Sequence, residues 1–195
     1  MKLNDWQKNT MVIETKRLIL RELTADDFES LYRILADPDI MRYYPRPIDE
    51  AQVRSWITRN RERYRIFGFG LWAVCLKETG NLIGDCGLTM QLIGGQIKPE
   101  IGYHIHTGHQ RKGYGTEAAI AVRDWTFRNT PFNIVYSYMK YTNEPSARTA
   151  RAYGCKQVDE FVDEVNEITK VFAISREEWE NKHLPASYDY QQVEV

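Results

Sequence analysis

Hydrophobic and polar residues follow two rhythms along this chain, and these rhythms predict strands and helices in alternation. Segments with alternating or short β-rich hydrophobic runs are predicted strands: 12–23, 71–77, 82–92, 100–107, 134–141, 158–165 and 168–174. Segments with hydrophobic residues three or four positions apart are predicted helices, which begin near Thr24, Asp49, Gly113 and Asn143. This order predicts a single α/β domain with a mixed sheet of about seven strands and four helices.

The borders of the first two predicted helices carry residues that commonly cap helices. Thr24 and Asp27 have the spacing of a capping box, and Pro38 disfavours helical backbone at the residue before it. Asp49 is a typical N-cap residue, and Gly68 is a typical residue after a helix C-terminus. We therefore expect helices that end near residue 37 and at residue 68.

Composition and charge are those of an ordinary globular domain. The 195 residues carry a net charge of −1, so no global field favours nucleic acid or an anionic membrane as a partner. We expect an N-terminal extension over residues 1–10, a folded domain over 11–180 and a polar tail over 181–195. Residues 1–10 lack the apolar core of a signal peptide and no run could span a membrane, so a cytoplasmic location is expected; a homodimer stays open.

Two side-chain patterns raise the question of a metal or a disulfide. Cys75, Cys86 and Cys155 form no Cys-x-x-Cys pair, so we expect neither a disulfide framework nor a cysteine zinc site. His104, His106 and His109 form a His-x-His-x-x-His pattern, but no further ligand stands at a suitable spacing. We therefore expect no metal site.

The segment from Glu100 to Ala118 predicts a strand, a basic glycine-containing turn and the start of a helix, an order that suits a phosphate. A nucleoside triphosphate loop is excluded, because no Lys-Ser or Lys-Thr pair follows Gly113. A dinucleotide site is disfavoured, because no acidic residue ends the next strand. The sequence Gln110-Arg-Lys-Gly113-Tyr-Gly115 matches an acyl-coenzyme A turn, although a Gly-x-Gly turn also occurs where a helix simply packs tightly.

At this point the chain resembles the GNAT superfamily of N-acetyltransferases, and within it the branch of ribosomal-protein N-terminal acetyltransferases. The resemblance rests on four segments in the right order: 14–21, 82–88, 100–103 and 141–146, the last followed by Gly154-Cys155. It implies that residues 11–180 are an N-acetyltransferase domain in which the strands 100–107 and 134–141 splay apart. It also implies acetyl-CoA as the acyl donor, with no metal.

The same resemblance implies a set of coenzyme contacts. The pantetheine arm would follow the strand residues Tyr103, His104, Ile105, His106 and Thr107. The pyrophosphate would lie on the turn residues Gln110, Arg111, Lys112, Gly113, Tyr114, Gly115 and Thr116. Asn143 and Ser146 would contact the coenzyme near its thioester.

The implied reaction is direct attack of an amine on the acetyl thioester. Glu100 is the candidate base, with an ion pair to Arg or Lys at a strand end as its alternative role. A backbone N–H within Tyr103–Ile105 would polarise the carbonyl. The tyrosine that serves as acid in many family members is replaced here by Ala150, while Tyr153 lies three residues farther along the helix, so Ser146 is the candidate group at the sulfur.

The acceptor follows partly from the cost of making an amine neutral at pH 7. A Lys or polyamine nitrogen costs about 4 to 5 kcal/mol, whereas a protein N-terminal α-amine costs about 1 kcal/mol. An α-amine acceptor therefore needs only a modest base, and the resemblance to the ribosomal-protein branch implies a protein N-terminal α-amine as the leading acceptor. The alternatives are a small-molecule amine (a polyamine, an amino sugar or an amino-acid-like metabolite) and, in another class, a non-catalytic acyl-CoA-binding module.

The acceptor is expected to enter over the first two helices and the final hairpin. Aromatic candidates for its site are Tyr43, Tyr44, Trp56 and Trp72, together with the segment 160–167. The acidic cluster Asp159, Glu160, Asp163, Glu164 and Glu167 suits a cationic amine, although it is equally typical of a solvated hairpin.

Overall fold

A computed structural model describes residues 11–181; the predicted extension 1–10 and residues 182–195 of the predicted tail lie outside the described residues. Within this range the chain forms one eight-stranded sheet in the order β1-β2-β3-β4-β5-β6-β8-β7. The strands are β1 (Met11–Glu14), β2 (Leu18–Arg21), β3 (Leu71–Leu76), β4 (Leu82–Ile93), β5 (Gln96–Ile105), β6 (Ile134–Lys140), β7 (Lys156–Asp163) and β8 (Glu167–Ser175). All neighbours are antiparallel except β5 and β6, so the sheet is mixed, as predicted.

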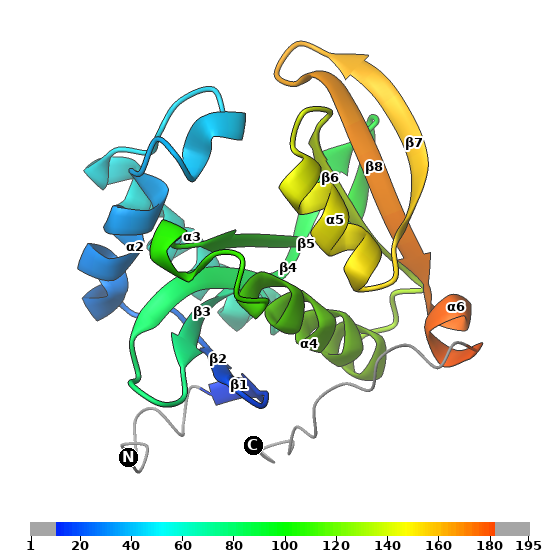
Figure 1. Cartoon of the computed structure of the whole chain (residues 1–195). Coiled ribbons are helices and arrows are strands. Elements are labelled where there is room, and N and C mark those ends of the chain that lie inside the picture. The colour runs from blue at the N-terminus through cyan, green and yellow to red at the C-terminus, as the bar shows by residue number, and fades with distance from the viewer. Residues whose placement is uncertain (1–10, 182–195) are drawn as a thin grey trace.

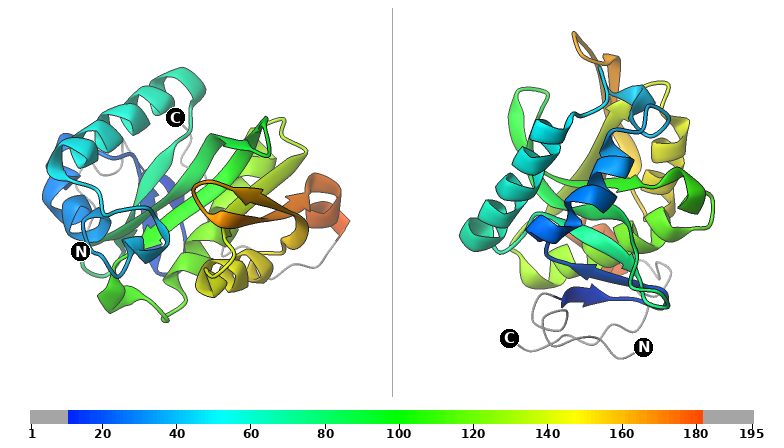
Figure 2. Two further views of the ribbon diagram at one scale, coloured as in Figure 1. Left: turned by 90° about the horizontal axis from the view of Figure 1, so that it is seen from above. Right: turned by 90° about the vertical axis from the view of Figure 1, so that its left-hand side faces the viewer.

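Helices cover both faces of this sheet (Figures 1 and 2). They are α2 (Phe28–Leu35), α3 (Glu50–Phe67), α4 (Tyr114–Asn129), α5 (Glu144–Ala152) and α6 (Arg176–Asn181). Helices α2 and α3 lie on one face, and α4 lies on the other, below the central strands in Figure 1. The described residues thus contain one strand and one short helix more than predicted.

Local capping signals placed the helix borders correctly. Asp49 accepts a hydrogen bond from the backbone N–H of Gln52 at 2.8 Å, and Gly68 ends α3 in the left-handed conformation with φ 75°. Asp27 accepts from the backbone N–H of Thr24 at 2.8 Å, as a capping box requires. These contacts lie within a few residues of each other, which is why sequence alone predicts them.

The predicted strand 12–23 is wrong, because it is a hairpin of β1 and β2. The backbone N–H of Thr15 donates to the Leu18 carbonyl at 2.9 Å, and the backbone N–H of Leu18 donates to the Thr15 hydroxyl at 2.9 Å. The turn is further held by Glu117 of α4, which accepts from the backbone N–H of Arg17 at 2.9 Å. A partner one hundred residues away thus stabilises the turn.

The predicted start and end of the strand 100–107 are also wrong. β5 begins at Gln96, directly after the Gly94–Gly95 turn, so Glu100 lies in mid-strand. The strand ends at Ile105, so Thr107 lies in a 3-10 helix instead of in the sheet. The strand tolerates Pro99, which is uncommon in central strands, because at this point β5 pairs only with β4.

β5 and β6 diverge after a single point of contact. Their parallel pairing is confined to Glu100 and Tyr136, and the Ser137 hydroxyl then donates to the Ile101 carbonyl at 3.3 Å. Beyond this point the two strands separate toward their carboxyl ends (Figure 1). The expected splay is therefore present, and it divides the sheet into β1–β5 and β6–β8.

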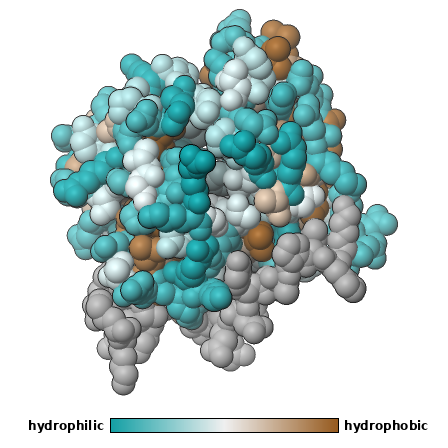
Figure 3. All heavy atoms as spheres, viewed as in Figure 1, coloured by the Kyte–Doolittle hydropathy of each residue, from teal (hydrophilic) through white to brown (hydrophobic). Residues whose placement is uncertain are grey.

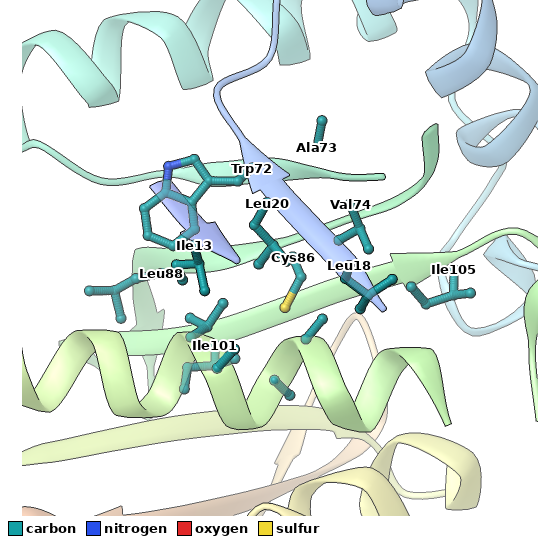
Figure 4. Packing of buried hydrophobic residues seen from close by; sticks show 14 of the residues in the cluster. Ile13, Leu18, Leu20, Trp72, Ala73, Val74, Cys86, Leu88, Ile101 and Ile105 are labelled. Atoms are coloured by element: carbon teal, nitrogen blue, oxygen red, sulfur yellow. The ribbon is translucent and has the colours of Figure 1, made fainter. Parts of the chain in front are cut away.

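The main core lies between the β1–β5 part of the sheet and α4 (Figure 4). Trp72 is completely buried there, with its ring edge-on to Trp125 of α4 at a centroid distance of 4.9 Å. The prediction that Trp72 helps to line the acceptor site is therefore wrong. Cys75, Cys86 and Cys155 are buried and free.

No helix among residues 11–181 is long and apolar enough to cross a membrane. Hydrophilic residues cover most of the coloured surface on the face that Figure 3 shows.

Candidate active site

Two cavities meet where β5 and β6 separate. The β7–β8 cavity, of about 710 Å³, is lined by Trp56, Glu100, Tyr138, Phe161 and Asp163 among others. The α4 cavity, of about 460 Å³, is lined by the end of β5, the turn before α4, and α5. Six residues line both cavities: Tyr43, Tyr44, Tyr103, His104, Asn143 and Ser146. A ligand in one cavity can therefore reach a ligand in the other at these residues.

The turn before α4 has the backbone geometry of an anion-binding site. Gly113 is the N-cap residue of α4 and has φ 83°, and Arg111 also has a positive φ of 59°. The N–H groups of the first helical turn have no partner within the helix, and the helix dipole adds partial positive charge. This turn forms one end of the α4 cavity.

Eleven of the predicted coenzyme-contact residues line the α4 cavity: Tyr103, His104, Ile105, Gln110, Arg111, Gly113, Tyr114, Gly115, Thr116, Asn143 and Ser146. The other three do not line it. The His106 ring accepts from the backbone N–H of Gly108, and the Lys112 ammonium donates to the Gly108 carbonyl at 2.8 Å. The Thr107 hydroxyl contacts Asp37 at 3.4 Å.

Two side chains, Gln110 and Arg17, brace the turn before α4. The Gln110 amide donates to the Ile105 carbonyl at 2.9 Å, which joins the turn to the end of β5. Arg17 donates to the Lys112 carbonyl at 3.0 Å and to the Glu117 carboxylate at 2.6 Å. Arg17 therefore positions the backbone of the turn, a role that the sequence did not reveal.

Glu100 faces the β7–β8 cavity from the middle of β5. Its side chain is buried and accepts from the Thr89 hydroxyl at 3.1 Å. No Lys or Arg among residues 11–181 forms an ion pair with it, unlike its predicted alternative role. Burial raises the pKa of Glu100 to about 7, and Thr89, His104 and Arg63 oppose this shift without cancelling it.

The register of β4 and β5 brings further polar residues to the same place. Thr89 pairs with Glu100, Gly87 with Gly102 and Asp85 with His104 across the two strands. Alternate residues of a strand share a face, so these three pairs form one strip. Gly102 keeps the strip open, because a Cβ there would lie 3.1 Å from the Glu100 carboxylate.

A chain of hydrogen bonds runs from α3 to the junction of the cavities. The Trp56 indole N–H donates to Asp85 Oδ2 at 3.0 Å, and Asp85 Oδ1 lies 2.8 Å from His104 Nδ1. The other ring nitrogen, His104 Nε2, lies 2.9 Å from the Tyr44 hydroxyl. The sequence prediction missed Asp85, whose signal is a lone carboxylate in the apolar strand 82–88.

Helix α5 and its N-cap residue form another wall of the junction between the two cavities. Asn143 caps this helix by accepting from the backbone N–H of Ser146 at 3.2 Å, and the Ser146 and Tyr103 hydroxyls are 3.1 Å apart. Ala150 and Tyr153 are completely buried and line neither cavity. Helix α5 therefore offers the Ser146 hydroxyl to the junction but no phenol.

Most of the predicted acceptor residues line the β7–β8 cavity. Tyr43, Tyr44 and Trp56 line the β7–β8 cavity, as do Phe161, Asp163, Glu164, Val165 and Asn166 from the final hairpin. Asp159, Glu160 and Glu167 do not line it. His106 and His109 stack edge to face at 5.8 Å, and nowhere in the described part of the chain do three His, Cys, Asp or Glu side chains group as for a metal.

Comparison with known proteins identifies this architecture. Residues 17–156 match the family model described as an acetyltransferase (GNAT) domain. The chain belongs to the GNAT acetyltransferase family. The match includes the turn before α4 and the strip on β4 and β5, but it ends where β7 begins, so the hairpin wall of the β7–β8 cavity lies outside it.

The chain is also similar to individual proteins. The chain is 35% identical over 141 residues to the uncharacterized protein YkkB of Bacillus subtilis, covering 72% of this chain and 82% of the relative. It is 27% identical over 179 residues to the uncharacterized N-acetyltransferase YnaD of the same organism, covering 87% and 99%. A ribosomal-protein alanine acetyltransferase from Vibrio fischeri has the same fold with a TM-score of 0.70, at 14% identity and with 86% and 98% of the two chains covered.

Proposed function

We propose that this GNAT enzyme transfers the acetyl group of acetyl-CoA to a primary α-amine by direct attack. The observation that carries the proposal is the junction of two cavities, one ending at the turn before α4 and the other containing the buried Glu100. A donor in the α4 cavity and an amine in the β7–β8 cavity would meet at Tyr44, Tyr103, His104 and Ser146.

Acetyl-CoA would bind in the α4 cavity, with its pyrophosphate and its pantetheine arm at different elements. The pyrophosphate would accept hydrogen bonds from the N–H groups of the first α4 turn, where glycine at 113 and 115 keeps the backbone accessible. The pantetheine arm would lie along the edge of β5 that β6 leaves unpaired beyond Glu100. A backbone N–H of Tyr103–Ile105 would stabilise the oxyanion that forms at the thioester carbonyl, with Ser146 at the sulfur.

Glu100 is the base in this proposal, and its pKa helps to select the acceptor. A base with a pKa of about 7 takes a proton from an α-ammonium group at a cost of about 1 kcal/mol. The same transfer from a Lys or polyamine ammonium costs about 5 kcal/mol, because that group has a pKa near 10.4. A protein N-terminal α-amine is therefore the preferred acceptor, and the fold shared with the ribosomal-protein alanine acetyltransferase is compatible with it.

A small-molecule amine is the second candidate. The β7–β8 cavity of about 710 Å³ lies within the range of about 300 to 1,000 Å³ that is typical of small-ligand sites. Its aromatic walls, Trp56 and Phe161, and its carboxylates, Asp163 and Glu164, suit a compact cation.

An amine panel tests donor and acceptor together. Acetyl-CoA at about 100 times its Kd should stabilise the fold by about 2.7 kcal/mol, whereas NAD and ATP should not. Peptides with a free N-terminus should then release free thiol from acetyl-CoA faster than the same peptides blocked at the N-terminus and carrying a Lys. Turnover only with small amines would select the second candidate; binding without turnover would indicate a non-catalytic module; and no acetyl-CoA binding would refute the proposal.

Thr89→Val should shift the pH dependence of turnover. The Thr89 hydroxyl stabilises the Glu100 carboxylate and lowers its pKa, so valine, which has a similar shape, should raise that pKa. A hydrogen bond of about 1 kcal/mol corresponds to a shift of somewhat less than about one pH unit. The acidic limb of kcat should move upward by that amount, whereas Thr126→Val, at a buried threonine of α4, should leave it in place. An unchanged limb in Thr89→Val would remove Glu100 as the titrating base.

A further inference from the structure

The departing coenzyme sulfur needs a proton, and α5 has no phenol to supply it. Ala150 and Tyr153 are buried outside both cavities. The hydroxyls of Tyr103 and Ser146 bond to each other at 3.1 Å, and Tyr103 also donates to the Ser146 carbonyl at 3.2 Å. Among residues 11–181, neither hydroxyl has a hydrogen bond to an Asp, Glu, His, Lys or Arg side chain that could replace a lost proton.

Tyr44 approaches the same junction from the opposite side. It lies in the loop before α3, lines both cavities, and has its hydroxyl 2.9 Å from His104 Nε2. Burial, with Glu100 and Asp85 nearby, raises the pKa of Tyr44 well above its ordinary value. The phenol therefore stays protonated and is available as a donor.

His104 is arranged to act through Tyr44 and not directly. Its Nδ1 is occupied by Asp85 at 2.8 Å and its Nε2 by Tyr44 at 2.9 Å, so neither ring nitrogen is left for a substrate. Asp85 is itself completely buried and is held by the Trp56 indole at 3.0 Å. Hydrogen bonds at both ring nitrogens thus fix the orientation of the His104 ring.

The charges around His104 favour the imidazolium form. Asp85 faces it from β4, Glu100 from its own strand, Tyr44 from the loop, and α3 contributes the uncharged Trp56. Arg63 of α3 carries a positive charge that lowers the pKa of Glu100. Burial alone would lower the pKa of His104, but Asp85 and then Glu100 outweigh it, so the pKa is raised.

We propose that Tyr44 donates its hydroxyl proton to the departing coenzyme sulfur and that His104, oriented by Asp85, replaces that proton through Nε2. This inference rests on the proposed function. In the step, the amine nitrogen forms a bond to the acetyl carbon, the carbon–sulfur bond breaks, and the sulfur receives the Tyr44 proton. The amine enters the step neutral, after Glu100 has passed its ammonium proton to solvent. The second proton, which the nitrogen loses as the new bond forms, goes to Glu100, so His104 ends neutral and Glu100 protonated, and exchange with solvent restores both. Tyr44 is the catalytic residue of the relay; His104 and Asp85 are positioning residues.

The relay predicts a pH-dependent loss in Tyr44→Phe and His104→Gln. A thiolate with a pKa near 8.5 leaves readily, so a lost donor should lower kcat by about 10- to 100-fold, at the lower end of general acid catalysis. His104 must be protonated to act, so the ratio of wild-type to variant kcat should be largest below the raised pKa of His104. It should fall toward one as the pH rises through that pKa. In Tyr44→Phe, which keeps His104 beside Glu100, the ionisation of the amine and of Glu100 cancels in this ratio. His104→Gln also removes a group that lowers the pKa of Glu100, so the Tyr44→Phe ratio decides the test.

Asp85→Asn and Tyr32→Phe complete the experiment. Asp85→Asn should lower the pKa of His104, read by NMR titration of the ring without any substrate, and should move the fall in the ratio to lower pH. Tyr32 stacks on Phe28 in α2 away from both cavities, so Tyr32→Phe should match the wild type at every pH.

The outcomes separate this inference from the proposed function. A wild-type/variant ratio that is constant with pH, or that grows with pH, would overturn the relay while leaving the acetyltransferase intact. An unchanged His104 pKa in Asp85→Asn would overturn it as well. A wild-type protein that acetylates no amine would overturn the proposed function, and the relay with it.

Discussion

Gly113→Glu should abolish the binding of acetyl-CoA. Gly113 is the N-cap residue of α4 with φ 83°, and a Cβ there would lie 3.3 Å from the Arg17 guanidinium. The new carboxylate would take the N–H groups of the first helical turn and would repel the pyrophosphate. Like charges about 4 Å apart near a protein surface repel by about 4 kcal/mol, which corresponds to a loss of affinity of about a thousandfold. Calorimetry and the thermal shift with acetyl-CoA measure this loss.

Gly68→Glu is the matched control for this variant. Gly68 also has a positive φ, of 75°, no atom lies within 4 Å of its Cβ position, and it ends α3 away from both cavities. Both variants carry the backbone strain of a side chain in the left-handed region, about 1 to 2 kcal/mol. Only Gly113→Glu should lose acetyl-CoA binding; equal affinity in the two variants would move the pyrophosphate away from this turn.

Glu100→Gln should lower kcat by about 100- to 1,000-fold without changing the affinity for acetyl-CoA. The amide cannot accept the ammonium proton, and general base catalysis contributes about this much. In the wild type, kcat should rise with pH through about 7, because only the ionised carboxylate acts. That limb should be absent in Glu100→Gln. Full activity in this variant would exclude Glu100 from the mechanism.

The same substitution should stabilise the protein at alkaline pH. The folded pKa of Glu100, about 7, lies above the ordinary 4.5, so the native state binds more protons than the unfolded state between these values. Stability from the protonated form is complete below about pH 4.5 and is lost as the pH rises to 7, by up to about 3 kcal/mol. Glu100→Gln should therefore melt above the wild type at pH 8, and the difference should vanish at pH 4.

Glu22→Gln is the control for both measurements. Burial raises the pKa of Glu22 too, but this residue lies outside the two cavities. It should retain turnover. A comparable loss in Glu22→Gln would indicate a general effect of removing a carboxylate with a raised pKa.

Features set by neighbours in sequence could be predicted for this chain. The caps at Asp49 and Gly68 depend on contacts within a few residues, and the structure has them where predicted. The Gly113 turn is also where predicted, because its positive φ favours glycine, although Arg17 braces it from far along the chain. The first hairpin could not be predicted in the same way, because its turn is held by Glu117 from a helix far along the chain. The hydrophobic pattern of residues 12–23 alone predicts one strand.

The missed part of the candidate site depended on strand register. Ile93 pairs with Gln96 around the Gly94–Gly95 turn, and counting outward along β4 and β5 brings Asp85 opposite His104. A predicted strand that began at residue 100 gave no such count, so Asp85 and His104 stayed unrelated. Tyr44 has no such signal, since it reaches His104 from a loop sixty residues away.

The separation of β5 and β6 also affects how the protein avoids association with itself. An unpaired strand edge is a template for another chain, and such edges usually lie at the outside of a sheet, here at β1 and β7. The edge of β5 that faces the gap lies in the interior of the sheet, with β6 and α5 beside it. A foreign sheet cannot approach it, whereas a single extended chain as thin as pantetheine can. Within residues 11–181, the fold thus leaves this edge of β5 unpaired with a strand beyond Glu100 while shielding it from aggregation.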